Sequence, residues 1–292
     1  ILIIKYKFTL IIKRVEILAL KYNFKYVNAS FFVRKVNMAK ANKLAIINQK
    51  GGVGKSTISV NVAYGLAEKG KKTLLIDLDP QAHSSEIYKP EDEIIYTVKE
   101  LFADPKFDIL KVIRKAFSKG NKVENLDIIH STIQFAKVAE QVSSRIHREK
   151  ILHQHIRKLD YEYIIFDCPP NLGVITINAI YSADIMLIPI TYDKGALDGM
   201  ADLIETIKEV KENITCPYLI IRNNFDARNK QTNFYVENEL NPFVSSMLKT
   251  KIRKTESLNQ ARIVGQPIQL YELSSHGTAD YKLLVEELIQ NV

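Results

Sequence analysis

The sequence predicts an α/β fold with a single doubly wound, mostly parallel sheet and helices on both faces. Short, fully apolar runs recur along the chain without period-two alternation, as in strands that are buried on both sides. Segments with helical spacing separate these runs, which is typical of parallel βαβ units. Four further segments directly follow predicted strands, at residues 48–57, 77–81, 167–170 and 223–226. Since the carboxyl ends of parallel strands share one sheet edge, we expect these four segments to form a ligand site there.

Each expected element corresponds to one such run or segment. The apolar runs that predict strands are residues 44–47, 73–76, 126–129, 163–166, 185–188 and 218–221. The segments with helical spacing are residues 56–69, 174–182, 196–212, 232–248 and 277–290, with short helices near 98–102 and 109–117 and a long charged helix over 135–159. Gly70 ends the first of these helices. We therefore expect seven or eight strands in one sheet.

The composition is that of an ordinary globular chain, with 292 residues of which 46% are hydrophobic and 25% charged. The net charge of +8 is unevenly distributed, because residues 1–37 hold eight lysines and arginines against one acid, Glu16. The rest of the chain is nearly neutral. Bulk charge therefore does not predict a nucleic-acid partner, and any such partner must be recognised by local basic patches.

Residues 1–37 are expected to form a basic and apolar extension that precedes a single domain over residues 38–292. Charges interrupt the apolar stretches, whereas a membrane-spanning helix needs about 18–20 apolar residues. Met38 is the first methionine, and a clean predicted strand follows it. This favours a natural start at Met38, with the extension not part of the native protein. The alternative is a basic arm that touches a membrane or DNA.

A glycine-rich loop follows the first predicted strand and indicates a phosphate-binding site. The common pattern G-x-x-x-x-G-K-[ST] aligns with residues 49–56, where Gln49 replaces the first glycine and Lys50 is an additional lysine. The glycines allow backbone N–H groups to point at phosphate oxygens, and the following helix adds its positive N-terminal end. The residues expected to bind a nucleoside triphosphate are Lys50, Gly51, Gly52, Val53, Gly54, Lys55, Ser56 and Thr57.

Lys55 is expected to reach the β- and γ-phosphates, and the Ser56 hydroxyl to bind Mg²⁺. Asp167 ends a predicted strand, where a carboxylate that holds Mg²⁺ through a water belongs. Asp79 follows a different strand and is expected to position the attacking water. Asp77 is the weaker candidate of the three, and each aspartate could instead be a cap or turn residue. Together these residues predict hydrolysis of ATP with Mg²⁺ as cofactor.

Three motifs in combination resemble those of the ParA/MinD superfamily of P-loop ATPases. Residues 50–57 (KGGVGKST) resemble its deviant Walker A motif, residues 77–81 (DLDPQ) its Walker A′ motif, and residues 163–170 (YIIFDCPP) its Walker B motif. The ParA/Soj partition branch is the most similar, and the resemblance spans about residues 40–290. It implies a P-loop NTPase fold and a domain with ATPase activity over residues 38–292.

The resemblance also implies roles for single residues and partners. Lys50 matches the lysine that reaches across an ATP-sandwich homodimer, Lys55 the lysine that acts within its own chain, and Asp79 the aspartate that activates water. Asn223 stands where the family contacts adenine. Family members bind DNA without sequence preference, and a ParB-like partner stimulates their slow hydrolysis. A cytoplasmic, nucleoid-associated protein for plasmid or chromosome partition is therefore expected.

Three further inferences concern partners and departures from the family pattern. Acids on the polar face of the C-terminal helix disfavour membrane binding. The expected DNA contacts are Lys208, Lys211, Arg228, Lys230, Lys251, Arg253 and Lys254. Ala82-His83 stand where the family usually has Gly-Asn. Arg253-Lys254 stand at a usual Pro-Arg pair, and Ser257 at a later Arg. The alternative function is a nucleotide-gated positioning or regulatory switch with negligible turnover.

Overall fold

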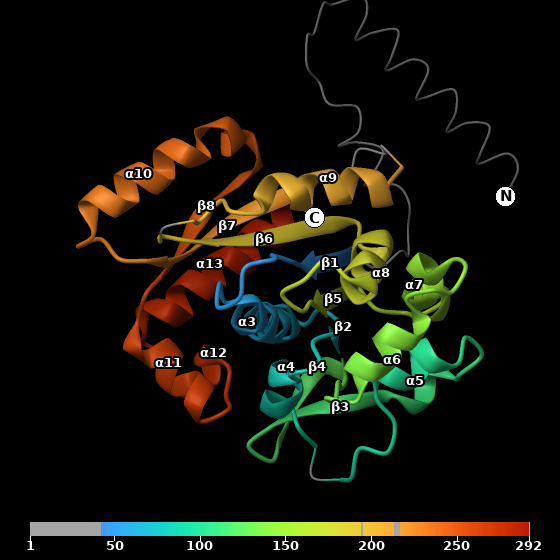
Figure 1. Cartoon of the computed structure of the whole chain (residues 1–292). Helices are drawn as coiled ribbons and strands as arrows, with labels where there is room; N and C mark the ends of the chain where they lie inside the picture. The colour runs from blue at the N-terminus through green and yellow to red at the C-terminus, as the bar shows by residue number, and fades with distance from the viewer. Residues whose placement is uncertain (1–41, 91, 194, 213–216, 292) are drawn as a thin grey trace, which may run out of the picture. The chain divides into compact units, whose positions relative to one another are not determined.

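The described part of the chain is built on an eight-stranded sheet in the order β3-β4-β2-β5-β1-β6-β7-β8 (Figure 1). A computed structural model describes residues 42–90, 92–193, 195–212 and 217–291. The strands are β1 (Asn42–Ile46), β2 (Thr73–Asp77), β3 (Ile113–Ser118), β4 (Asn121–Ile129), β5 (Tyr163–Asp167), β6 (Ile185–Thr191), β7 (Tyr218–Phe225) and β8 (Met247–Arg253). All neighbours pair in parallel except β3 and β4, which are antiparallel. The predicted extension at residues 1–37 lies outside the described residues.

Successive strand residues point into two hydrophobic cores, one on each face of the sheet. Ala45 belongs to the first core, whereas Leu44 and Ile46 belong to the second. The first core is covered by α5 (Val98–Ala103), α6 (Phe135–Val142), α7 (Ile151–Ile156), α8 (Val174–Ser182), α9 (Met200–Val210) and α10 (Lys230–Leu240). The second is covered by α3 (Lys55–Glu68), α4 (His83–Ile87), α11 (Glu256–Ile263), α12 (Ile268–Tyr271) and α13 (His276–Asn291). This arrangement confirms the predicted doubly wound sheet.

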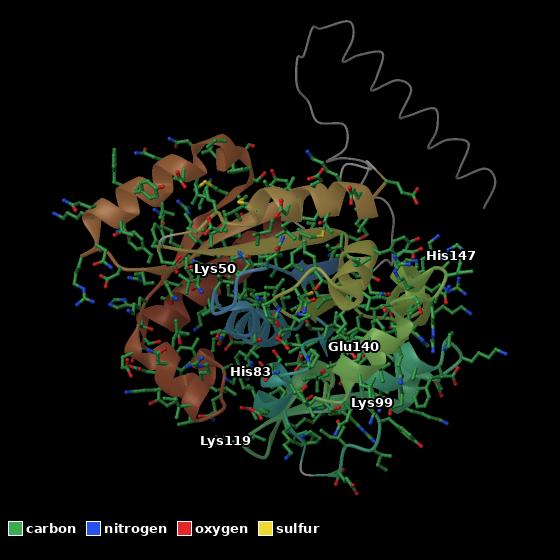
Figure 2. All side chains as sticks on the ribbon, viewed as in Figure 1. Lys50, His83, Lys99, Lys119, Glu140 and His147 are labelled. Atoms are coloured by element: carbon green, nitrogen blue, oxygen red, sulfur yellow. The ribbon has the colours of Figure 1, made fainter. Side chains whose placement is uncertain are left out.

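The prediction of a helix near residues 109–117 is wrong. A single 3₁₀ turn, η1 (Ile109–Lys111), is followed by strand β3, which forms a hairpin with β4. Lys119 and Gly120 close the hairpin with φ of 51° and 75°, the conformation of a two-residue turn whose twist matches that of the strands. Figure 2 labels Lys119 at this turn. The dipeptide Lys119-Gly120 was the local signal for a hairpin.

Two long predicted helices are also divided in the structure. The stretch 135–159 contains α6, a 3₁₀ turn η2 (Arg148–Lys150) and α7, with His147 at a left-handed φ of 58° before the turn. The stretch 232–248 contains α10, then η3 (Asn241–Ser246) with Pro242, and the start of strand β8. A proline cannot continue the hydrogen bonding of a helix, so α10 ends before it. No described helix is both long and apolar enough to cross a membrane.

Carboxylates of α13 cover the outer edge of β8, the last strand of the sheet. The backbone N–H groups of Lys249 and Thr250 donate to Glu287 at 2.6 and 2.9 Å. The N–H of Arg253 donates to Asp280 at 2.9 Å. Unpaired N–H groups at a sheet edge can pair with another chain. Here side chains from the same chain occupy three of them.

Gly65 allows α3 and α13 to pack closely. A Cβ atom at position 65 would lie 2.7 Å from Val285 Cγ2. Both residues are buried in the second core. A larger side chain at residue 65 must therefore displace α13.

We expect Gly65→Leu to lower the free energy of unfolding by about 1–3 kcal/mol, because it overpacks this contact. Chemical denaturation followed by circular dichroism measures the change. Glu68→Leu places the same side chain on an exposed position of the same helix and should leave stability nearly unchanged. Equal stabilities of the two variants would contradict the packing argument.

Candidate nucleotide site

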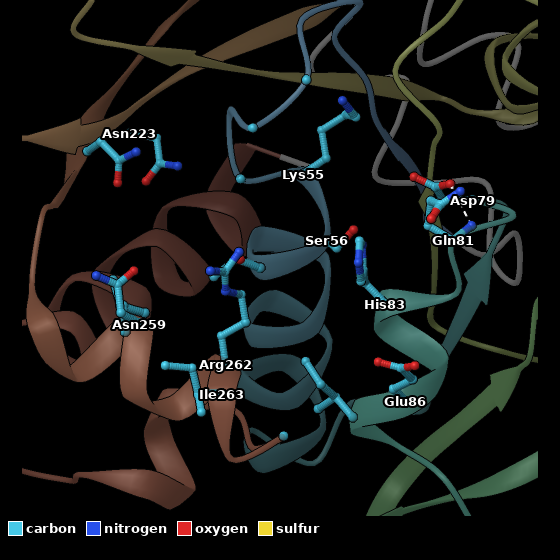
Figure 3. Close-up of a pocket in the computed structure, with 18 of the residues that line it drawn as sticks. Lys55, Ser56, Asp79, Gln81, His83, Glu86, Asn223, Asn259, Arg262 and Ile263 are labelled. Atoms are coloured by element: carbon cyan, nitrogen blue, oxygen red, sulfur yellow. Dashed lines mark hydrogen bonds between the residues drawn. The ribbon is translucent and has the colours of Figure 1, made fainter.

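Strand register brings the segments that follow β1, β2, β5 and β7 to one edge of the sheet. Ile46 and Asp77 are both in register with Asp167, and Thr191 is in register with Asn223. A cavity of about 540 Å³ opens at this edge (Figure 3). Its lining includes Gly51, Gly52, Gly54, Lys55, Ser56, Thr57, Asp79, Gln81, His83, Glu86, Asn223, Asn224, Leu258, Asn259 and Arg262.

The glycine loop has a backbone that only glycine adopts without strain. Gly52 and Gly54 have φ of 75° and 92°. A Cβ atom at Gly54 would lie 2.3 Å from Asn223 Nδ2, and this Nδ2 donates to the Val53 carbonyl at 2.8 Å. Helix α3 begins directly afterwards at Lys55. The loop thus presents backbone N–H groups and a helix N-terminus, which together suit phosphate oxygens.

Asn223, which the resemblance assigns to adenine, holds the phosphate loop in this structure. Asn223 also lines the cavity, although the whole residue is only 5% exposed. It therefore lies between the phosphate loop and the cavity. The adenine contact itself stays a prediction.

Lys55 is buried at the base of the loop, with its Nζ 3.1 Å from the Lys50 carbonyl oxygen. Burial lowers the pKa of its ammonium group, and the nearby Asp167, Cys168 and Asp79 oppose this shift. The ammonium group therefore lies close to the carboxyl groups of Asp167 and Asp79, and an incoming phosphate would add a further favourable charge contact to it.

Lys50 is held by its own chain. Its Nζ donates to Asp193 Oδ1 and lies 3.5 Å from the Gly195 carbonyl oxygen. The other carboxylate oxygen, Asp193 Oδ2, accepts from the Thr191 hydroxyl at 2.9 Å. Asp193 was missed by the sequence reasoning. Its position two residues after the end of β6 is the signal that could have found it.

Asp167 is fully buried beneath the cavity lining, which does not include it, and is surrounded by hydroxyl groups. Its Oδ1 accepts from Ser59 at 3.0 Å and its Oδ2 from Ser84 at 2.6 Å. Burial raises the pKa of this carboxyl, while hydrogen bonds from Ser84, Ser56 and Ser59 lower it. Ser56 and Asp167 therefore bring two oxygen donors together, the ligand type that Mg²⁺ prefers. These residues fit a magnesium ion, and Ser59 and Ser84 were not predicted.

The two aspartates after β2 have different positions. Asp77 is fully buried and does not line the cavity. Its carboxylate accepts from the Asp79 N–H and from the Ser85 N–H and hydroxyl. Burial and then the nearby Asp167 raise its pKa well above the usual range. Asp79 lines the cavity and accepts from the Gln81 N–H at 2.9 Å, the dashed bond in Figure 3. Asp77 is thus placed as an anchor for the start of α4, and Asp79 as a group facing a ligand.

The expected DNA contacts divide between two edges of the sheet. Lys208 and Lys211 lie at the end of α9 near the amino edge, where Lys211 Nζ donates to the carbonyls of Tyr181 and Ala183. The other five lie toward the carboxyl edge, and three of them pair with acids: Arg228 with Asp226, Lys251 with Glu237, and Arg253 with Asp280. Lys230 and Lys254 are exposed, without an ion pair to any described residue. The seven residues therefore do not form one surface.

The fold, the phosphate loop and the aspartates together define an ATPase of the P-loop class, and residues 41–220 match the AAA domain family. The sporulation initiation inhibitor protein Soj of Bacillus subtilis (strain 168) is 35% identical over 254 residues, which cover 85% of this chain and 98% of Soj. The chromosome partitioning protein ParA of Myxococcus xanthus (strain DK1622) is 32% identical, over 85% of this chain and 87% of its own. The chain belongs to the ParA/Soj family of partition ATPases.

Solved structures agree with this fold. A plasmid partition protein of Borrelia burgdorferi B31 bound to AMPPNP has a TM-score of 0.71 at 26% identity, covering 87% of this chain and all 100% of its own. Cobyrinic acid a,c-diamide synthase of Mycobacterium smegmatis, with bound ADP and magnesium, has a TM-score of 0.71 at 22% identity. That match covers 86% of this chain and 95% of the synthase. The second likeness concerns the fold alone.

Ala82 stands where the family usually has glycine, and its backbone is in the left-handed region. Its φ is 58°, at the residue that precedes helix α4. A side chain with a Cβ atom is strained by about 1–2 kcal/mol in this conformation.

We expect Ala82→Gly to raise the free energy of unfolding by about 1 kcal/mol, because it relieves this strain. Ala279→Gly, the same change at an exposed position in α13, should lower it by about 1 kcal/mol. Denaturant unfolding of both variants tests the opposite signs. A loss of stability in both would show that Ala82 is not strained.

Proposed function

We propose that this protein is a dimerising, Mg²⁺- and ATP-dependent ATPase that binds DNA without sequence preference and moves plasmid or chromosomal DNA with a ParB-like partner. The observation that carries the proposal is the phosphate loop with two lysines. Buried Lys55 lines the cavity, whereas Lys50 is not among the lining residues and its side chain is 29% exposed. Family membership supports partition, and the AMPPNP bound to the Borrelia burgdorferi protein supports a triphosphate ligand.

The phosphate loop and α3 would bind the triphosphate through backbone N–H groups, Lys55 and the Thr57 hydroxyl. Ser56 and Asp167 would hold Mg²⁺. When bound, this ion neutralises phosphate charge. The Ser56 hydroxyl is one of the groups that lower the pKa of Asp167, so the two side chains lie close enough to share one ion.

Asp79 would orient the attacking water. It is 7% exposed, lines the cavity and follows β2 rather than the strand that carries Asp167. Because Asp79 follows a different strand from Asp167, its carboxylate can accept a hydrogen bond from water without displacing the Mg²⁺ ligands. Asp77 cannot take this role, because hydrogen bonds from Asp79 and Ser85 occupy its carboxylate.

Lys50 would serve the ATP of a second copy. In the single chain it is paired with Asp193, so dimerisation has to exchange this ion pair for a contact with the partner's phosphates. The Lys50 and Asp193 side chains are 29% and 51% exposed, and ion pairs this accessible to water contribute at most about 1 kcal/mol. The exchange therefore has a low energetic cost, which suits a reversible dimer.

We expect Asp79→Ala to reduce phosphate release about 100-fold, because the attacking water loses its orienting group, while ATP binding is retained. A coupled phosphate assay with and without DNA measures the rate. Asp202→Ala, at an exposed aspartate of α9 outside the cavity, should match the wild type. If wild type and Asp79→Ala release phosphate equally, Asp79 is not catalytic. The chain is then better described as a nucleotide-gated switch with negligible turnover.

DNA binding is expected at the carboxyl edge of the sheet, the edge that carries the nucleotide. Lys230 and Lys254 are exposed there, whereas Lys208 is exposed near the opposite edge. Lys230→Ala combined with Lys254→Ala should weaken binding of a labelled duplex in ATP. It should also reduce the slope of log affinity against log salt by about 2, or about 1 per lost phosphate contact.

Fluorescence anisotropy across a salt series measures this effect, with Lys208→Ala as the matched control that should behave like wild type. Lys50→Ala should abolish the increase in DNA affinity that ATP produces, because it removes the contact with the second copy's ATP on which the dimer depends. Binding that is independent of salt, or equal weakening by Lys208→Ala, would contradict the assignment of the surface.

A further inference from the structure

We propose that Arg262, on α11, is a nucleotide-binding residue that contacts the phosphate nearest the nucleoside. This inference rests on the proposed function, because it takes the cavity to be the ATP site. Neither the phosphate-loop pattern nor the motifs of the family resemblance include this arginine. It lines the cavity opposite the segment after β2.

Among the described residues of α11 and the turn after it that line the cavity, Arg262 is the only charged one. The neighbouring lining residues from the same segment are uncharged: Leu258, Asn259, Ile263, Val264 and Gly265. The guanidinium group makes no ion pair and no side-chain hydrogen bond with any residue that the structure describes, and Arg262 is exposed. In Figure 3 its side chain extends from α11 toward the N-terminal turn of α3 and the phosphate loop. An unpaired guanidinium in this position is suited to an anionic ligand group.

A second observation concerns a buried polar atom of another residue that lines the cavity. Tyr281 lines the cavity from α13 and is 0% exposed, yet its hydroxyl has no hydrogen-bond partner among the described residues. Buried hydroxyl groups are nearly always hydrogen-bonded. The cavity lining therefore contains an unsatisfied hydroxyl group that a polar part of a ligand could satisfy.

The position of Arg262 selects the phosphate that it contacts. Asp79, the proposed water-positioning residue, lies on the opposite side of the α3 N-terminus from Arg262 (Figure 3). A triphosphate with its terminal phosphate beside Asp79 presents its nucleoside end to α11. Asn223 and Asn224 line this same end, and their amides suit the edge of a base. Arg262 is thus placed for the α-phosphate and not for the bond that is cleaved.

The assignment has a structural consequence for α11. This helix begins two residues after β8, where Thr255 caps it by accepting from the Leu258 N–H. An arginine on α11 that holds the nucleotide links occupancy of the cavity to the segment that carries Lys254. The Arg262 guanidinium would then contribute both to nucleotide binding and to the position of the segment with Lys254.

Titration calorimetry of the full chain with ATP and with ADP, both with Mg²⁺, tests the proposal. We expect Arg262→Gln to weaken both nucleotides by about tenfold, because both contain the α-phosphate. Arg262→Lys should recover part of the loss. Glu86→Gln, at a cavity-lining charge on the opposite wall, should not weaken either nucleotide. The melting temperature without nucleotide should be unchanged, since Arg262 is exposed.

Two outcomes would overturn the inference alone, while wild type still binds ATP. One is unchanged affinity of Arg262→Gln for both nucleotides. The other is a loss confined to ATP, which would place the arginine at the terminal phosphate. Absence of ATP binding by wild type would instead overturn the proposed function, and this inference with it.

Discussion

The parallel pairing of β5 with both β1 and β2 is the constraint on which the site depends. It places Ile46 and Asp77 in register with Asp167, in strands about 4.8 Å apart. The loop after β1 and the aspartates at the ends of β2 and β5 are therefore held at one level. A slip by one residue would turn these side chains to the other face of the sheet. Because both faces are packed by apolar residues, the cores fix this register.

The same register concentrates negative charge in the interior. Asp77 and Asp167 are both fully buried, and this burial raises the pKa of both carboxyl groups. Serine hydroxyls and backbone N–H groups stabilise the two carboxylates, and Lys55 lies nearby. Such a cluster lowers the stability of the isolated fold but raises its affinity for a cation. The two buried aspartates are thus the cause of both the lower stability and the capacity to bind Mg²⁺.

The sequence was most informative where a local pattern determines the backbone. The loop glycines, the apolar runs and the aspartates at strand ends predicted the sheet and the edge at which the cavity lies. Prediction was wrong where short signals compete, as at Lys119-Gly120, whose turn makes a hairpin from a stretch that also fits helical spacing. Arg262 could not be placed in the site from the sequence alone, because only the crossing of distant segments brings it to the cavity. Asp193 was missed although it follows a strand end, since nothing local shows that this end meets the phosphate loop. The division of the basic residues between two edges likewise depends on which end of α9 carries Lys208 and Lys211.

The carboxylates that cover β8 limit how two copies can associate. Glu287 and Asp280 occupy the outward N–H groups of Lys249, Thr250 and Arg253, so a second chain cannot continue the sheet at these positions without displacing α13. Association by strand addition would be long-lived and independent of nucleotide, since backbone hydrogen bonds would hold it. Shielding β8 closes one of the two strand edges of the sheet. In the dimer proposed above, which forms at the loop edge, the lifetime of the complex would follow the lifetime of the bound triphosphate. The shielding of the β8 edge thus disfavours a long-lived association that the bound nucleotide would not control.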